Sequence, residues 1–326
     1  MYHQFYKLSG PPFNLTPDNR FFFGSTGHTR AISHLMYGLA QEEGFVVITG
    51  EVGAGKTTLV ERLTAQLGSG AFVIARIVTT LVSGEELLRL VVGSFGVRDT
   101  AGDKATLLRR FEQTVAEHHR FGRRCLLIVD EAQNLPLAAL EELRMLSNIT
   151  VGGRASVQMI LLGQPQFRDM LASRDLDQLR QRVLASYHLG PLDAAETRSY
   201  IEHRLRTVGW VGDPSWDDDA FAAIFAHTQG IPRRINTLCS RVLLYGALEE
   251  AHRLTAPIVN DVAAELARDL GANGAAPQSE PIPAAAAALS EDATARLAAL
   301  EDQLARQRRT LDRLLGLLSA YAESAA

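Results

Sequence analysis

Short apolar runs alternate with helical stretches over residues 25–190. Four runs are clear and a shorter fifth follows them; they cover residues 44–49, 72–78, 125–129, 157–162 and 186–189. Continuous apolar runs separated by helices are typical of strands that are buried on both faces of a parallel sheet. We therefore predict an α/β domain over residues 25–190.

The pattern changes after residue 190. Four helical stretches follow, at about residues 194–208, 217–228, 232–249 and 256–269, and no strand is evident among them. Gly230 and Pro232 mark one helix boundary, because glycine ends helices and proline suits a first helical turn. The pattern indicates a separate small helical domain over residues 191–270.

The two ends of the chain differ from these domains. Residues 1–24 are rich in aromatic residues and proline. Burial of each large side chain stabilises by about 1.5–3 kcal/mol, so we expect this segment to dock on the next domain. Residues 271–289 are rich in Ala, Pro and Gly and are interpreted as a linker.

A leucine heptad follows the linker in residues 290–326. Its a and d positions are occupied by Leu297, Leu300, Leu304, Leu311, Leu314 and Leu318, with Gln307 as the one polar d residue. Arg296 at g and Glu301 at the following e would attract across a parallel dimer. The pattern predicts a coiled-coil tail that pairs either with another copy of the chain or with a partner helix.

Composition narrows the class of protein. The 326 residues are 46% hydrophobic and 21% charged, with a formal net charge of -4. These values exclude a disordered or fibrous chain and give no support to a dedicated, strongly basic nucleic-acid binder. Cys125 and Cys239 lie far apart, no apolar run could span a bilayer, and no signal peptide is evident. A cytoplasmic location is expected.

The first apolar run leads into a phosphate-binding motif. The sequence GxxxxGK[ST] is matched by Gly50, Glu51, Val52, Gly53, Ala54, Gly55, Lys56 and Thr57, and Thr58 follows. Glycines let backbone N–H groups surround phosphates, and the next helix directs its positive end at them. Lys56 would contact the β- and γ-phosphates of ATP, and Thr57 would ligate Mg²⁺. The alternative is a chance match, which the strand before and the helix after make improbable.

The third apolar run ends in two acids, Asp130 and Glu131. A carboxylate at the end of a buried strand needs a partner, because its desolvation is costly. We expect Asp130 to hold Mg²⁺ and Glu131 to orient and deprotonate the attacking water. The alternative is a pair of solvated loop acids. The strand at residues 72–78 between the two motifs is compatible with the additional-strand branch of P-loop ATPases.

Four further polar residues are candidates for the site. Gln164 follows the fourth run and would sense the γ-phosphate, unless its amide bonds to the loop backbone. Arg180 and Arg182 precede the fifth run, and one of them would reach a neighbouring subunit's γ-phosphate. At least one of these two arginines is instead expected to lie on the surface or to form an ion pair within the chain. Arg233, after Pro232, would reach the nucleotide from the helical domain.

Together these motifs resemble those of AAA+ ATPases over about residues 25–270. More narrowly, the chain resembles the ExeA/GspA-like ATPases of general secretion, and within them the ATPase encoded with exosortase (PEP-CTERM) and exopolysaccharide loci. The stretches that carry the resemblance include EGFVVITGEVGAGKTTL, LLIVDEAQNLPLAALEELRMLSN and GIPRRINTLCSRVLL. The resemblance implies a P-loop sheet with a helical lid, ATP hydrolysis, homo-oligomers and an envelope or exopolysaccharide assembly partner.

The chain also departs from the ExeA pattern. ExeA-type proteins continue into a membrane span and a peptidoglycan-binding part, whereas the heptad segment follows the ATPase here. Envelope anchoring and peptidoglycan binding are therefore not carried over, and recruitment to the inner face of the membrane would require a partner.

Two rival functions share the ATPase motifs. Related ATPases act on DNA in transposition and origin recognition, which would favour a basic tail, yet residues 291–326 hold six acids and five arginines. A helicase is a third interpretation, because Asp130 and Glu131 open a helicase-like acid motif, but a single ATPase core with a lid argues against it. Salt-dependent DNA binding would separate the first two functions.

Overall fold

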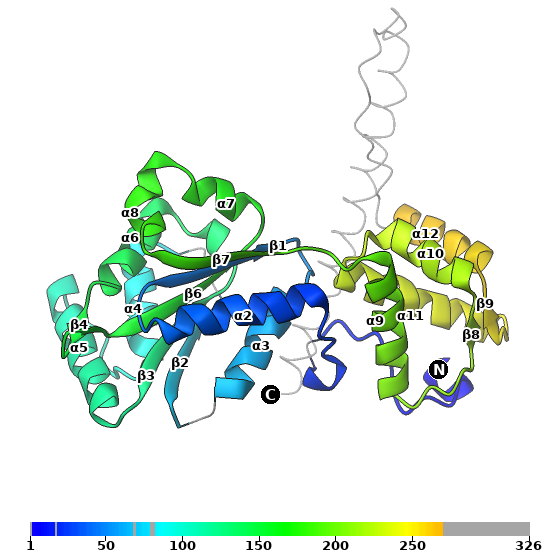
Figure 1. Ribbon diagram of the computed structural model, residues 1–326, viewed down its shortest axis with the longest axis horizontal. Coiled ribbons are helices and arrows are strands. Elements are labelled where there is room, and N and C mark those ends of the chain that lie inside the picture. Colours follow the sequence, from blue (N-terminus) through cyan, green and yellow to red (C-terminus); the bar gives the residue numbers. More distant parts are fainter. Residues whose placement is uncertain (1, 17, 68–69, 79–81, 270–326) are drawn as a thin grey trace, which may run out of the picture. The chain divides into compact units, whose positions relative to one another are not determined.

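A five-stranded parallel sheet forms the centre of the α/β part. The computed structural model describes residues 2–16, 18–67, 70–78 and 82–269. The sheet has the order β2-β3-β6-β1-β7, and Figure 1 shows its helices on both faces. Its strands are β1 (Phe45–Gly50), β2 (Phe72–Ile77), β3 (Arg124–Val129), β6 (Val157–Gly163) and β7 (Val183–Leu189).

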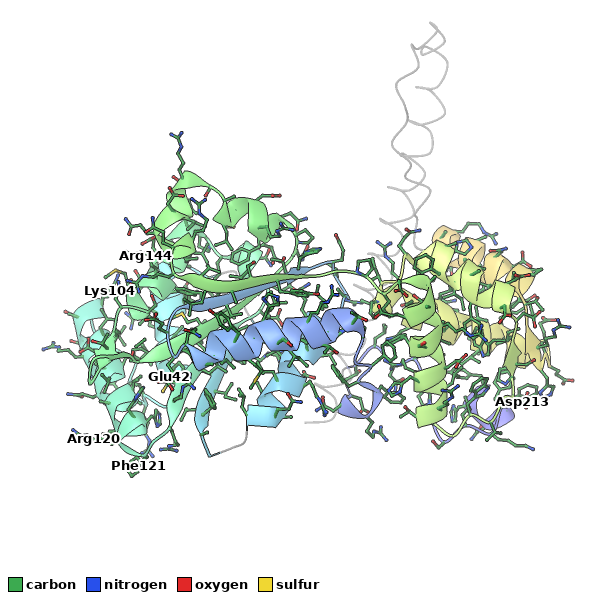
Figure 2. The ribbon with its side chains drawn as sticks, in the orientation of Figure 1. Glu42, Lys104, Arg120, Phe121, Arg144 and Asp213 are labelled. Atoms are coloured by element: carbon green, nitrogen blue, oxygen red, sulfur yellow. The ribbon has the colours of Figure 1, made fainter. Side chains whose placement is uncertain are left out.

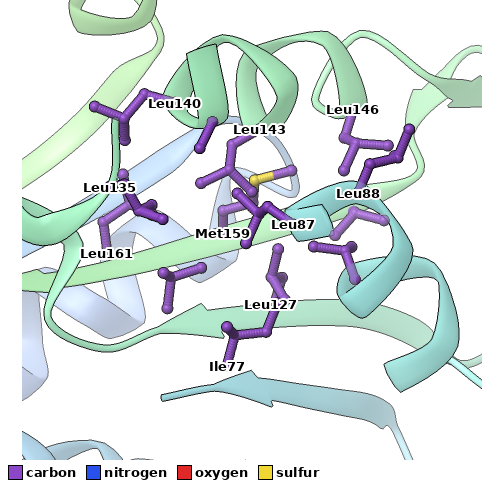
Figure 3. Close-up of a cluster of buried hydrophobic side chains, with 14 of the residues drawn as sticks. Ile77, Leu87, Leu88, Leu127, Leu135, Leu140, Leu143, Leu146, Met159 and Leu161 are labelled. Atoms are coloured by element: carbon purple, nitrogen blue, oxygen red, sulfur yellow. The ribbon is translucent and has the colours of Figure 1, made fainter. Parts of the chain in front are cut away.

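Alternate side chains of the strands enter two separate cores. Phe45 and Val47 of β1 pack in one cluster, and Val46 and Ile48 pack in the other. The first cluster, which includes Leu87, Leu140 and Leu143, is the one shown in Figure 3. Both faces of β1 are thus apolar, which is why its sequence is a continuous apolar run.

Seven helices cover the two faces of the sheet within the described ranges. On one face lie α2 (Thr26–Ala40) and α3 (Lys56–Leu67). The other face is covered by α4 (Gly84–Ser94), α5 (Lys104–Arg120), α6 (Leu137–Leu146), α7 (Gln166–Leu171) and α8 (Asp177–Arg180).

Short 3-10 turns, a short helix and a β-hairpin lie outside the sheet and the seven helices that cover it. The turns are η1 (Asn19–Phe21), η2 (Ala132–Asn134) and η3 (Arg174–Leu176), and a short helix α1 (Tyr2–Phe5) precedes them. The hairpin pairs β4 (Thr150–Val151) with β5 (Arg154–Ala155) around Gly152 and Gly153, both at positive φ. Lys104, whose side chain is 49% exposed, lies on the surface of the α/β part (Figure 2).

Four helices form the lid, residues 191–269: α9 (Ala194–Thr207), α10 (Asp218–Thr228), α11 (Pro232–Leu248) and α12 (Ala256–Asp269). They confirm the four predicted helical stretches to within one residue at each end. The expectation of no strand is wrong, because β8 (Ser215–Trp216) pairs in parallel with β9 (Arg253–Leu254). Only Trp216 and Leu254 of this pair are buried, so the strands are too short to produce a periodic signal.

The N-terminal segment packs mainly against the lid rather than against the α/β domain that follows it in sequence. Tyr6, Leu8, Phe13 and Phe21 belong to the lid's hydrophobic cluster. Arg204 of α9 anchors the segment, because its Nε donates to Pro12 O at 2.6 Å and its Nη2 to Asn14 O at 3.2 Å. The expected docking partner is therefore wrong for most of these side chains: the lid offers an apolar core that sequence order does not reveal.

The strand predictions for the sheet are confirmed, and the fifth strand is longer than predicted. It begins at Val183, whose side chain is only partly buried, so the apolar signal is weak there. The strand that lies between β1 and β3 in the sheet is β6, whereas β2 is at the edge. The predicted domain boundaries stay predictions, and the predicted linker and coiled-coil tail lie outside the described residues.

Candidate nucleotide-binding site

The phosphate-binding motif forms the loop between β1 and α3. Gly53 has φ +83 and Gly55 has φ +98, a region that residues with a Cβ rarely adopt. Ala54 N donates to Glu51 O at 3.1 Å, which closes the turn. The first N–H groups of α3 have no partner within the helix, so they are available for an anion at its N-terminus.

The side chain of Lys56 is hydrogen-bonded to the start of the phosphate-binding loop. Its Nζ donates to Gly50 O at 2.7 Å and to Glu51 O at 3.0 Å. Burial lowers the pKa of Lys56, while the negative charges of Glu131, Asp130 and Glu51 oppose that shift. A buried ammonium whose direct partners are neutral carbonyls is suited to an anionic ligand.

Asp130 lies at the end of β3 and is 5% exposed. Its Oδ2 accepts from Thr57 Oγ1 at 3.0 Å and from Arg76 Nη2 at 3.3 Å. The alternative of a solvated loop acid is therefore wrong for Asp130. A carboxylate beside a hydroxyl provides the oxygen ligands that Mg²⁺ prefers, so these two residues fit the ion. Arg76 was not predicted, because one arginine in an apolar run gives no distinctive signal.

Glu131 is fixed by two amides. Its backbone is left-handed, with φ +52, and its Oε2 accepts from Gln133 Nε2 at 2.6 Å and from Gln164 Nε2 at 3.1 Å. Burial raises the pKa of Glu131, but the two amide donors and the charge of Lys56 outweigh burial and leave the pKa lowered. The carboxylate is consequently ionised at neutral pH and oriented by its neighbours.

The side-chain amide of Gln164 donates to the carboxylate of Glu131, so its predicted alternative, a bond to the loop backbone, is not the contact that the structure shows. Gln164 follows β6, which pairs with β1, and its own N–H donates to Gln133 Oε1 at 2.9 Å. Gln133, Gln164 and Glu131 thus form a closed triangle of hydrogen bonds. The role of Gln133 was not predicted, although its place two residues after Glu131 puts it within reach.

A cavity of about 300 Å³ lies beside the loop. The loop and α3 line it with Val52, Gly53, Gly55, Lys56, Thr57 and Thr58. The N-terminal segment contributes Asn14, Leu15, Thr16, Asp18 and Phe21 to Phe23, while Glu131 and His28 are the other α/β residues. The lid adds Leu192, Tyr200, Arg204, Pro232, Arg233 and Asn236. Three separate parts of the sequence therefore enclose one space.

Arg233 joins the lid to the phosphate-binding loop. Its backbone N–H donates to Gly53 O at 3.2 Å. A Cβ built on Gly53 would lie 2.3 Å from the Cβ of Arg233, so the two backbones can approach only because residue 53 is glycine. The predicted lid residue thus lies at the cavity.

The two predicted finger residues lie elsewhere. Arg182 is next to Val183, which pairs with Phe45 at the start of β1, whereas the phosphate-binding loop follows the other end of β1. Six strand residues at about 3.3 Å each place the two ends about 20 Å apart. Arg180 pairs with Asp177 at 2.7 Å, and Arg182 Nη1 lies 3.5 Å from Ser147 Oγ. Neither arginine lines the cavity of its own chain.

The parallel sheet with its phosphate-binding loop, acid pair and lid has the fold of P-loop NTPases of the AAA type. Residues 39–171 match the family described as AAA domain. The chain is similar to General secretion pathway protein A of Aeromonas hydrophila, with 36% identity over 258 residues. That alignment covers 78% of this chain, which spans only 46% of the length of its relative.

Solved structures support the fold. The Aeropyrum pernix ORC2 protein matches with a TM-score of 0.58 and 16% identity over 77% of this chain and 72% of its own. The RuvB Holliday junction branch migration motor of Thermotoga maritima matches with a TM-score of 0.51 and 20% identity, covering 75% and 70%. At these identities the likeness concerns architecture alone.

Two features are absent from the described residues. None of their helices has the length and apolar character to cross a bilayer. No group of three or more His, Cys, Asp or Glu side chains in the described ranges could hold a metal ion.

We predict that Gly53→Ala weakens ADP binding at least about tenfold. A left-handed residue with a Cβ costs about 1–2 kcal/mol, and the new methyl group would also meet Arg233. Isothermal titration with ADP measures the effect. Gly190→Ala is the matched control, because a Cβ there meets nothing within 4 Å. Equal affinities for the two variants would contradict the described loop–lid contact.

Proposed function

We propose that this protein binds Mg–ATP and hydrolyses it to ADP and phosphate. The observation that carries the proposal is the convergence of Lys56, Thr57 with Asp130, and Glu131 at one end of the sheet, beside a cavity. Similarity to an AAA domain family supports it. Lys56 would exchange its neutral carbonyl partners for phosphate oxygens, whose negative charge would balance the positive charge of the buried ammonium.

Glu131 is proposed as the general base. Its Oε2 is occupied by the amides of Gln133 and Gln164, so Oε1 is available to accept a proton from water. The water oxygen then bonds to the γ-phosphorus, the bond from that phosphorus to the bridging oxygen breaks, and ADP leaves. Mg²⁺, held through Thr57 and Asp130, would neutralise charge on the phosphates. Gln164 would sense the γ-phosphate through its contact with Glu131.

We propose that the active form is a homo-oligomer in which Arg182 or Arg180 completes a neighbour's site. The position of both arginines at the opposite end of the sheet from their own phosphate-binding loop supports this. An arginine that stabilises the transferred phosphate from another subunit would make hydrolysis depend on assembly.

Similarity to General secretion pathway protein A favours a role as an ATP-driven switch of a secretion or envelope assembly. The finer proposal, an exosortase- and exopolysaccharide-associated ATPase, rests on the sequence stretches that carry that resemblance. A DNA-associated switch is the alternative. The likeness to Drosophila ORC bound to DNA, at 16% identity and a TM-score of 0.58 over 84% of this chain and 68% of its own, concerns the fold and does not favour that alternative.

We predict that Lys56→Ala and Glu131→Gln separate binding from hydrolysis. Lys56→Ala should weaken ATP binding about 10- to 100-fold, because a charge-assisted hydrogen bond of about 1.5–3 kcal/mol is lost. Glu131→Gln should keep ATP affinity and lower turnover by about 10²–10⁴-fold, because only the base is removed. Titration calorimetry and a phosphate-release assay measure the two effects. Turnover at the parental rate in Glu131→Gln would remove Glu131 from its role.

We predict that subunits lacking the finger are rescued by subunits that cannot bind ATP. Arg182→Ala should lose about 10³–10⁵ in rate if it is the finger, and mixing with Lys56→Ala chains should restore part of the activity, because those chains keep their arginines. Arg180→Ala is tested in parallel and Arg174→Ala is the control. Light scattering establishes assembly of each mixture. Assembled mixtures that stay inactive for both finger candidates would contradict a role between subunits.

A further inference from the structure

His28 faces the phosphate-binding loop from the other side of the cavity. It lies in the first turn of α2, is 6% exposed and lines the cavity together with Lys56. A Cβ built on Gly55 would lie 2.9 Å from His28 Nε2, so the imidazole edge rests against the loop. No motif in the sequence singles out this residue.

The imidazole is held in one orientation. Its Nδ1 lies 2.7 Å from Ser25 Oγ, which also accepts from the backbone N–H of His28 at 3.2 Å. Phe22 contacts the ring edge-to-face at 5.8 Å between centroids. Among the described residues, Nε2 has no hydrogen-bond partner. One nitrogen is therefore fixed by the protein, and the other is left for a ligand.

The surroundings keep this imidazole neutral. Burial lowers the pKa of His28 to about 4, and the charge of Glu196 on α9 only partly opposes that shift. Glu196 itself accepts from Thr26 N at 2.8 Å. The other charged side chains of the cavity are Asp18, Lys56, Glu131, Arg204 and Arg233. A neutral imidazole carries one N–H, and the hydrogen-bond partners of the ring determine which of its two nitrogens bears that proton.

We propose that His28 is a phosphate ligand of the bound nucleotide. Ser25 Oγ–H donates to Nδ1, so Nε2 carries the proton and donates it in a hydrogen bond to a phosphate oxygen held by the loop. The contact with Gly55 places this donor at the phosphate end of the cavity, whereas Leu15 and Phe21 supply apolar surface contributed by the N-terminal segment. This inference rests on the proposed nucleotide binding.

Two amide substitutions test which nitrogen matters. In His28→Gln the side-chain amide can reach the position of Nε2, and in His28→Asn it reaches only that of Nδ1. Both remove the ring, so a purely structural role would affect them alike. We expect His28→Asn to bind ADP about 10-fold or more weakly, since it loses a hydrogen bond to a charged group. His28→Gln should stay within about threefold of the parent.

Inorganic tripolyphosphate identifies the part of the nucleotide that is contacted. It lacks base and sugar, and its affinity is measured by competition with labelled ADP. We expect His28→Asn to weaken tripolyphosphate and ADP by similar factors. Unchanged tripolyphosphate affinity, or equal losses in the Asn and Gln variants, would overturn the assignment.

The tautomer of His28 can also be measured in the unmodified protein, which keeps the test valid if a variant does not fold. Two-bond ¹⁵N–¹H spectra of the histidine-labelled protein show which ring nitrogen bears the proton. With ADP bound we expect Nε2–H; an Nδ1–H tautomer would overturn the proposal. Lys56→Ala is run beside these tests. If Lys56→Ala loses ADP binding and His28→Asn does not, only the His28 assignment fails; if both bind as the parent does, the proposed function fails.

Discussion

The rest of the site depends on one buried charge, the ammonium of Lys56, which is held by the carbonyls of Gly50 and Glu51 at 2.7 and 3.0 Å. The loop between these carbonyls and Lys56 has Gly53 and Gly55 at positive φ, a conformation that residues with a Cβ rarely adopt. The loop keeps this shape because β1 is packed on both faces and leads directly into α3. A charge with neutral partners in a desolvated place favours an anion, and the cavity beside it provides the space.

The second constraint is that three distant parts of the sequence enclose that space. Phe13 and Phe21 belong to the lid's core although they precede the α/β part. Arg204 binds the backbone of the N-terminal segment, and Arg233 binds the phosphate-binding loop. The N-terminal segment and the lid thus share one core. We infer that a change in the position of the lid would also move residues 18–23.

Much of the α/β part could be predicted from sequence because its strands are apolar on both faces and its loop has a distinctive glycine pattern. The docking of Phe13 on the lid could not be predicted, since an apolar side chain does not specify which of the three cores it joins. Gln133 and His28 are held at the cavity by individual side-chain hydrogen bonds, which leave no periodic signal in the sequence. The strand pair at Trp216 and Leu254 is too short for any pattern.

We propose that one bound nucleotide contacts all three parts that line the cavity, and hydrogen–deuterium exchange tests this most directly. Exchange of the full chain is compared with and without Mg–ADP. We expect slower exchange at residues 50–58, at residues 18–23 and at the start of α11, residues 231–236. Protection limited to residues 50–58, with the other two segments unchanged at saturating ADP, would contradict it.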